Sequence, residues 1–156
     1  MGKNLVIIGA DFSENGIVTY QDLGTQELFD KKAALGNYTW IFSQRSNVSG
    51  KIKKVRIYPT TNGLFKIKVF KSDLTLRDSV EITTNQNVNT YQDYDVSLNV
   101  EPGDYIAYYG PSNGVYVPFT TSSDTLIYAV LGDVSAINFN IANHNEHTIQ
   151  VYIYVE

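Results

Sequence analysis

The fold of this chain is indicated most clearly by residues 149–155, which read IQVYIYV. Aliphatic side chains occupy every second position, and the positions between them hold glutamine or tyrosine. This two-residue period is that of a β-strand with one buried face. We therefore expect the aliphatic positions to face a core and Tyr152 and Tyr154 to point the opposite way.

Similar short apolar patterns recur along the chain at spacings typical of a β-sandwich or barrel. Strands are predicted near residues 4–8, 17–20, 38–42, 52–59, 64–71, 79–83, 95–100, 105–109, 115–119, 126–131 and 136–141. No long amphipathic helix lies between them, which excludes βαβ units. One short helix is predicted over residues 25–35, because Thr25 can cap its start and Gly36 can end it.

Composition excludes several classes of protein. The 156 residues suit one domain that is long enough to bury a core. The chain has no cysteine and therefore neither a disulfide nor a thiolate metal site, and its net charge of −4 argues against nucleic-acid binding. The apolar run at residues 5–8 is too short for a signal peptide or a membrane span, so synthesis in a cytoplasm without export is expected.

A cationic sheet face is expected if strands 52–59 and 64–71 pair directly. A three-residue loop ending at Gly63, in a left-handed conformation, would keep the apolar side chains of both strands on one face. The other face would then present a set of cations, namely Lys54, Arg56, Lys66 and Lys68. Like charges across a ladder are unfavourable, so this face needs water, acidic neighbours or an anionic partner. A solvated face is the simpler alternative.

The stretch GPSNG at residues 110–114 matches the G-x-S-x-G pattern of esterase nucleophiles. That motif requires a strand, a sharp turn and then a helix, whereas VYVPF follows here with the alternation of a strand. Pro111 and Asn113 are ordinary turn residues. Ser112 is therefore predicted to lie at a loop tip, and no catalytic residue is expected.

Neither metal nor cofactor is predicted. His144 and His147 form an H-x-x-H pattern with no obvious third ligand, and they are expected in an exposed loop. The acidic stretches 93–95 and 101–104 invite a calcium interpretation, but the Pro-Gly pair within the second favours a turn. A loop calcium is kept as a minor alternative. No phosphate-binding glycine loop is present.

Tyrosines provide the candidate contact surface. Around the turn at 101–104, Tyr108 is expected to face inward, while Tyr105 and Tyr109 are expected to face outward, as Tyr152 and Tyr154 do. Such a face can meet another subunit, since tyrosine is enriched at interfaces. It can also pack inside the protein or stack on sugar rings. We rank subunit contact first, internal packing second and glycan binding third.

Two stretches resemble known proteins. GKNLVIIGADFSENGI at 2–17 resembles the start of short proteins from gut Bacteroidales and their tailed phages, including crAss-like phages. GKIKKVRIY at 50–58 and VSLNVEPGDYIAYYG at 96–110 resemble a jelly-roll β-sandwich module from the same sources. The resemblance implies a jelly-roll-like antiparallel sandwich, either on a virion surface or as a glycan-facing accessory module.

The expected fold is therefore an all-β, jelly-roll-like sandwich over residues 37–156, with residues 1–36 as an arm of one strand and the short helix. The expected function is that of a non-enzymatic phage virion protein, such as a capsid decoration, head-fibre or tail-associated component. Its partners would be other copies, as a trimer by analogy, and other virion proteins, with no nucleic acid and no membrane. The alternative is a carbohydrate-binding module for host-surface glycans, with stacking candidates Trp40, Tyr105, Tyr109 and Tyr116.

Overall fold

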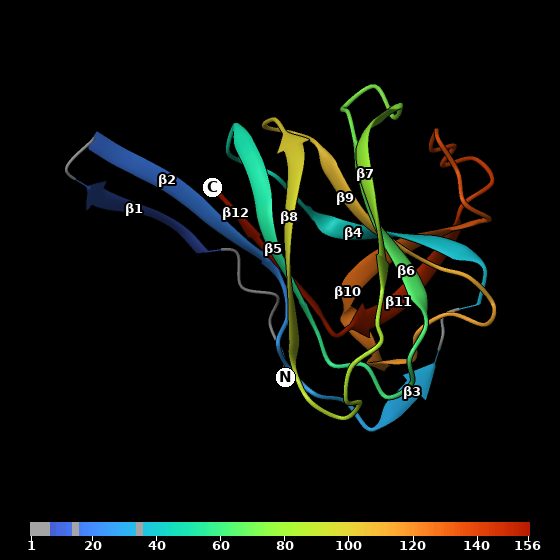
Figure 1. Cartoon of the computed structure of the whole chain (residues 1–156). Coiled ribbons are helices and arrows are strands. Elements are labelled where there is room, and N and C mark those ends of the chain that lie inside the picture. Colours follow the sequence, from blue (N-terminus) through green and yellow to red (C-terminus); the bar gives the residue numbers. More distant parts are fainter. Residues whose placement is uncertain (1–6, 14–15, 34–35) are drawn as a thin grey trace.

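The structure is a computed structural model that describes residues 7–13, 16–33 and 36–156. Its described residues form twelve β-strands and no helix, and the strands build two antiparallel sheets (Figure 1). The all-β sandwich expected from the sequence is confirmed. No described helix is long and apolar enough to cross a membrane.

One sheet has five strands and the other has seven. The five-stranded sheet contains, in spatial order, β1 (Ile7–Ser13), β2 (Gly16–Gly24), β12 (Val151–Val155), β5 (Gly50–Ile57) and β8 (Gln92–Val100). The seven-stranded sheet runs β11 (Asn143–Ile149), β10 (Val117–Leu131), β4 (Tyr38–Arg45), β9 (Tyr105–Gly110), β6 (Leu64–Phe70) and β7 (Leu76–Thr83), and β3 (Lys31–Ala33) also pairs with β10.

Eight of these strands have the connectivity of a jelly roll. The orders β2-β12-β5-β8 and β4-β9-β6-β7 place neighbours in the chain mostly in opposite sheets, as the two Greek keys of that fold require. The hairpin of β10 and β11 is added beside β4, and β1 is added beside β2. The jelly-roll-like architecture is thus confirmed, with additions at one edge of each sheet.

The short helix predicted at 25–35 does not form within its described part. Residues 25–29 have no regular structure, and Lys31–Ala33 pair with β10 as β3. Thr25 still accepts a hydrogen bond from the Glu27 amide, at 3.0 Å, as a capping residue would. Pairing with a distant strand therefore outweighs a weak local helix signal, as tertiary contacts often do. Residues 34–35 lie outside the described residues.

Three further predictions about strands are corrected. β10 is one strand of 15 residues, interrupted by a bulge between Thr121 and Leu126, where two strands were expected. Residues 136–141 form no strand. β5 and β6 lie in different sheets, so the predicted direct hairpin between them is wrong. Gly63 is not left-handed, and its lack of a side chain matters because a Cβ there would lie 2.5 Å from the Val115 amide nitrogen.

The core lies between the sheets and takes alternate side chains from both. It includes Val151, Ile153 and Val155, all fully buried, as the alternation in the opening stretch predicts. A second, smaller apolar cluster lies on the outer face of the seven-stranded sheet. There Ile137, from the loop at 132–142, is buried against β4, β6, β9 and β10 side chains. One outer face is therefore covered by a loop.

The chain crosses from one sheet to the other at Gln150, which divides the predicted strand 149–155 into the end of β11 and all of β12. The Gln150 side chain is fully buried and bridges two connections. Its Oε1 accepts a hydrogen bond from the Tyr58 amide at 2.5 Å, and its Nε2 donates to the Thr25 carbonyl at 3.2 Å. A buried amide here satisfies backbone groups that no ladder can reach.

We expect Gln150→Leu to lower the free energy of unfolding by about 2–3 kcal/mol, because it leaves buried backbone groups unpaired. Urea unfolding followed by circular dichroism measures the change. Gln86→Leu, at an exposed position, serves as the matched control and should leave the midpoint unchanged. Equal stability of Gln150→Leu and the wild type would contradict the bridging role.

Candidate binding groove

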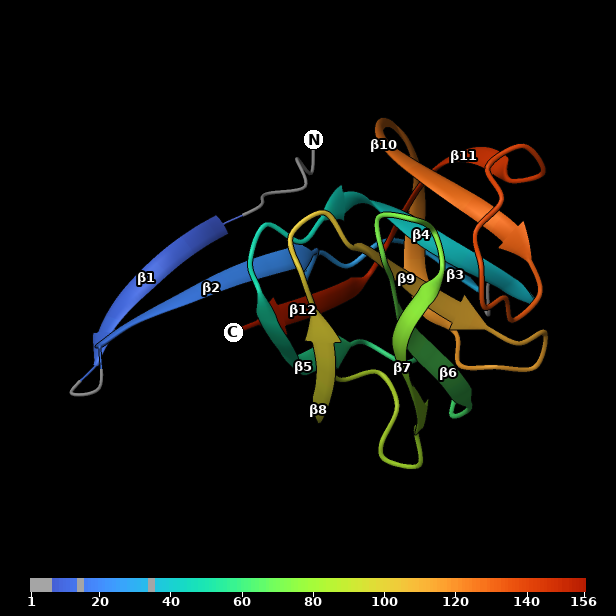
Figure 2. The same cartoon turned by 90° about the horizontal axis from the view of Figure 1, so that it is seen from above.

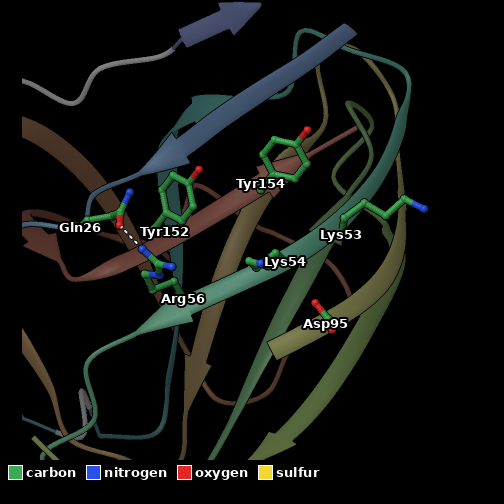
Figure 3. A pocket seen from close by; sticks show the side chains of 7 residues that line it. All are labelled: Gln26, Lys53, Lys54, Arg56, Asp95, Tyr152 and Tyr154. Carbon is green, nitrogen blue, oxygen red and sulfur yellow. Dashed lines mark hydrogen bonds between the residues drawn. The ribbon is translucent and has the colours of Figure 1, made fainter. Parts of the chain in front are cut away.

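The outer face of the five-stranded sheet contains a groove with a volume of about 350 Å³. It runs across β12, β5 and β8 (Figure 3). Its lining residues are Gln26, Lys53, Lys54, Arg56, Asp95, Tyr152 and Tyr154. Aromatic rings, cations and one carboxylate therefore lie together on this face of the sheet. The volume of the groove falls within the range of small-ligand sites.

Strand register builds the groove as two rows of outward side chains. In one row Tyr152 lies opposite Arg56, and Arg56 lies opposite Asp93. In the next row Tyr154 lies opposite Lys54, and Lys54 lies opposite Asp95. Directly opposed residues share a face of the sheet, so each row places a ring, a cation and a carboxylate in succession.

A β-bulge adds a second lysine to the groove. Tyr154 pairs with Lys54 and Val155 pairs with Ile52, which leaves Lys53 as the extra residue of β5 relative to β12. Ile52 is fully buried, whereas Lys53 is exposed and Lys54 is half-buried. The bulge therefore turns two consecutive lysines to the outer face, which regular alternation cannot do.

Neighbouring side chains hold both tyrosines. The rings of Tyr154 and Tyr20 stack, with centroids 6.0 Å apart and an interplanar angle of 28°. The Tyr152 hydroxyl donates a hydrogen bond to Asp22 Oδ1 at 2.5 Å. Burial, together with this hydrogen bond, raises the pKa of Tyr152 well above its ordinary value. Tyr152 therefore stays a neutral phenol at physiological pH.

Arg56 is engaged within the protein. Its Nε and Nη2 donate to the two carboxylate oxygens of Asp93, at 2.6 and 2.8 Å, and its Nη1 donates to Gln26 Oε1 at 2.7 Å. The hydrogen bond from Arg56 is the main reason that the pKa of Asp93 lies below its ordinary value. The Lys54 ammonium is 3.8 Å from the same carboxylate, and Lys53 forms no ion pair with the described residues.

The cationic patch predicted from Lys54, Arg56, Lys66 and Lys68 is not one surface. The first two lie on the five-stranded sheet and the last two on the seven-stranded sheet. Lys68 is only 3% exposed, and its ammonium donates to Asp133 and to the Val134 carbonyl. Lys66 also binds Asp133, at 2.6 Å. The second pair therefore anchors the 132–142 loop.

Two of the predicted stacking residues are buried, and a third is half-buried against its neighbours. Trp40 is 7% exposed in the core between the sheets, and Tyr109 is 8% exposed, with its hydroxyl donating to Asn37 Oδ1 at 3.0 Å. Tyr105 does face outward, but it packs against Phe139 and lies under the Arg45 guanidinium. Tyr116 is 42% exposed, outside the groove. Internal packing, ranked second among the alternatives, accounts for Tyr105 and Tyr109.

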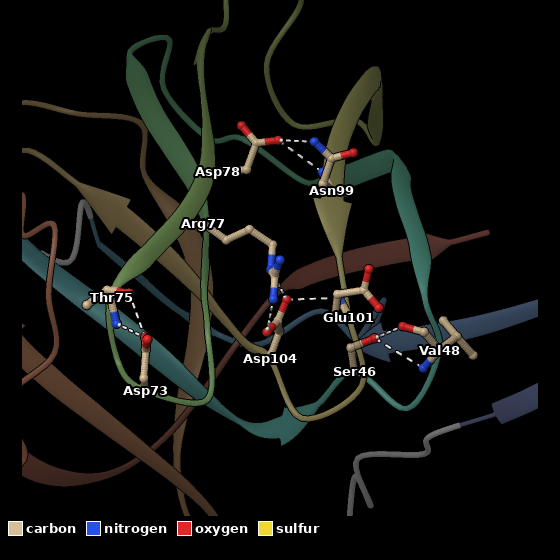
Figure 4. Close-up of polar contacts among 9 residues, drawn as sticks. All are labelled: Ser46, Val48, Asp73, Thr75, Arg77, Asp78, Asn99, Glu101 and Asp104. Atoms are coloured by element: carbon tan, nitrogen blue, oxygen red, sulfur yellow. Dashed lines mark hydrogen bonds and ion pairs between the residues drawn. The ribbon is translucent and has the colours of Figure 1, made fainter.

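The acidic stretch at 101–104 connects β8 to β9 and is bound to β7 through Arg77 (Figure 4). Asp104 is buried, and both of its carboxylate oxygens bind the Arg77 guanidinium of β7, at 2.5 and 3.1 Å. The Glu101 amide donates to the same carboxylate at 2.8 Å. Among residues whose side chains are described, no group of three or more potential ligands could hold a metal ion.

The remaining candidates lie outside the groove. Ser112 is an exposed turn residue, as predicted, and the Gly114 amide closes that turn on the Pro111 carbonyl at 2.9 Å. His144 and His147 belong to β11 and not to a loop, so that part of the prediction is wrong. Their side chains are outside the described residues.

Sequence reasoning identified Lys54, Arg56, Tyr152 and Tyr154 as outward-facing. It missed Gln26, which was assigned to a helix, and Lys53, because a bulge leaves no mark in the alternation. Comparisons with known proteins identify no relative, since no family model, curated protein or solved structure matches the chain.

Asp133 gives the fold an acid-sensitive anchor. Burial alone would raise the pKa of its carboxylate, but hydrogen bonds from Lys66 and Lys68 outweigh burial and lower it. A carboxylate with a lowered pKa stabilises the fold fully above its unfolded pKa, about 3.9, and this contribution is lost as the pH falls through the folded value. We expect the free energy of unfolding to decline below about pH 4 and to decline less steeply in Asp133→Asn.

Urea titrations at a series of pH values measure this slope. Asp30→Asn alters an exposed carboxylate that makes no ion pair within the described part of the chain, so it should keep the wild-type slope. A wild-type slope in Asp133→Asn would show that this anchor does not contribute to acid sensitivity.

Proposed function

We propose that this protein is a non-enzymatic structural subunit of a tailed-phage virion, assembling with further copies of itself through the ribbon of β1 and β2. The observation that carries the proposal is this ribbon, which extends away from the sandwich (Figures 1 and 2). The resemblance of residues 2–17, 50–58 and 96–110 to phage-associated modules supports the virion assignment. Jelly rolls also occur widely in viral capsid proteins.

The pairing pattern separates the base of the ribbon from its tip. β12 pairs with β2 only from Gly24 to Gln21, so these four residues belong to the body of the sheet. Residues 16–20 of β2 pair with β1 alone, and β1 is the edge strand of its sheet. Within the predicted 1–36 arm, the described residues that extend from the body are therefore 9–13 and 16–20, whereas residues 21–24 and β3 are built into the two sheets.

A two-stranded ribbon is marginally stable in water on its own. An exposed edge strand also presents unpaired backbone groups that accept another strand. Both properties favour a ribbon that is completed by contact with a neighbouring molecule. Capture of such an edge by a further strand is a recurring mode of protein association.

Charge favours a second copy as that neighbour. Residues 4–30 contain five acidic residues and no lysine or arginine, whereas residues 51–77 hold eight of the twelve cationic residues of the chain. Asp11 and Asp22 of this segment belong to the β1–β2 ribbon. The exposed Lys51 of another copy can meet an acidic ribbon, and complementary charge of this kind fixes partners and orientation. A trimer is the proposed state, by analogy with phage decorations and fibres.

We expect the full chain to sediment at a multiple of the chain mass in analytical ultracentrifugation at micromolar concentration, and a chain lacking residues 1–15 to sediment as a monomer. The deletion removes β1 but leaves the part of β2 that pairs with β12. Thermal melting should show that the shortened chain remains folded. Ser112→Ala, at an exposed turn, is the control and should assemble as the wild type does.

Ala10→Pro tests the same idea without a deletion, because proline within an edge strand removes a backbone donor. A monomeric wild type, or an assembly that survives both changes, overturns the proposal. Detection of the protein by mass spectrometry in purified particles tests the virion assignment separately from the assembly mode.

A further inference from the structure

We propose that the groove on the five-stranded sheet binds an acidic saccharide, with Tyr152 and Tyr154 stacking on pyranose rings and Lys53 and Lys54 pairing with sugar carboxylates. This inference goes beyond assembly, because the residues that line the groove lie outside β1 and β2, although Tyr20 and Asp22 of β2 hold its tyrosines. Tyr152 and Tyr154, which were expected to face outward, line this groove, whereas the stacking candidates Trp40, Tyr105, Tyr109 and Tyr116 do not.

The two tyrosines form a stacking platform of suitable geometry. They are two positions apart on β12, so their side chains share a face and repeat after about 7 Å along the strand. One face of a pyranose ring presents C–H groups, which pack well on aromatic rings, while its hydroxyls stay at the edge. Ligand sites commonly combine such apolar rings with a few polar groups that fix orientation.

The platform is ordered before any ligand arrives. Tyr20 stacks on Tyr154, and Asp22 accepts the hydrogen bond of the Tyr152 hydroxyl. Fixing a side chain in advance reduces the entropy lost on binding. The hydrogen bond of Tyr152 is also satisfied within the protein, so a sugar covering this ring displaces no internal partner.

The lysines supply the preference for an anion. Arg56 already binds both oxygens of Asp93 and the Gln26 amide oxygen. Its role is therefore to fix the positions of Asp93 and Gln26 beside the groove. Lys53 forms no ion pair with the described residues, and Lys54 has only the longer, 3.8 Å contact to Asp93. Both lysines line the groove with capacity for a carboxylate. The Lys53 side chain points away from the tyrosines in Figure 3, and its flexible four-carbon stem can turn to bring the ammonium to a ligand.

Asp95 favours a saccharide over a nucleic acid. Its carboxylate lines the groove beside Lys54 and can accept hydrogen bonds from sugar hydroxyls. The same carboxylate would repel the regularly spaced phosphates of a nucleic acid, and the chain as a whole has a net charge of −4. In a hydroxyl-rich ligand with widely spaced carboxylates, a carboxylate can pair with Lys54 while hydroxyls donate hydrogen bonds to Asp95.

Isothermal titration of the full chain with a hyaluronan tetrasaccharide at low salt tests the inference, because this saccharide carries a carboxylate only on every second sugar. Its methyl ester serves as an uncharged analogue of nearly the same shape. We expect the acid to bind and the ester to bind at least about tenfold more weakly. Tyr154→Ala and the double variant Lys53→Gln/Lys54→Gln should each weaken binding of the acid by a similar factor. Tyr116→Ala removes an exposed tyrosine outside the groove and should leave binding unchanged.

Several results would overturn the inference. These are no heat of binding at millimolar saccharide, equal binding of acid and ester, or full binding by the groove variants while thermal melting shows them folded. Tighter binding of an oligothymidylate than of the saccharide would assign the groove to single-stranded nucleic acid instead. The chain lacking residues 1–15 keeps Tyr20 and Asp22, and residues 21–24 still pair with β12. It should therefore still bind, so a failure of the assembly proposal leaves this test independent.

Discussion

The eight strands of the jelly roll must bury alternate side chains in one shared core, and this constraint decides which residues remain for function. The two outer faces use the remaining residues differently. On the seven-stranded sheet, the loop at 132–142 covers the outward side chains, and Lys66 and Lys68 hold it through Asp133. The five-stranded sheet keeps tyrosines and lysines at its surface. The outer face of the five-stranded sheet is therefore open and partly charged, and it can bind a ligand, whereas the outer face of the seven-stranded sheet is covered by its own loop.

Much of this arrangement follows from local alternation. The period of two identified most strands, placed Tyr108 in the core and turned Tyr152 and Tyr154 outward. Sheet membership does not follow from alternation, because it depends on pairing between residues far apart in the chain. The segments at 52–59 and 64–71 look like a hairpin, yet they lie in opposite sheets. The sequence IQVYIYV reads as one strand, although a buried glutamine within it marks the crossing between sheets.

The candidate groove was predictable to a similar extent. Outward-facing Lys54 and Arg56 followed from the pattern, but their separation from Lys66 and Lys68 required the topology. The neighbours that hold the tyrosines, Tyr20 and Asp22, come from a strand at the other end of the sequence. Trp40 was predicted as a stacking residue but lies in the core. An aromatic residue in a short strand gives no local sign of which face it occupies.

The position of β12 has a consequence for biosynthesis. This strand lies between β2 and β5, so the two parts of the five-stranded sheet that are translated earlier do not hydrogen-bond to each other. Until residue 155 has left the ribosome, both parts expose strand edges that β12 later covers. Such edges favour association with other unfinished chains. Closure of the sandwich is therefore a late event in synthesis, and until then the earlier strands keep edges at which unfinished chains can associate.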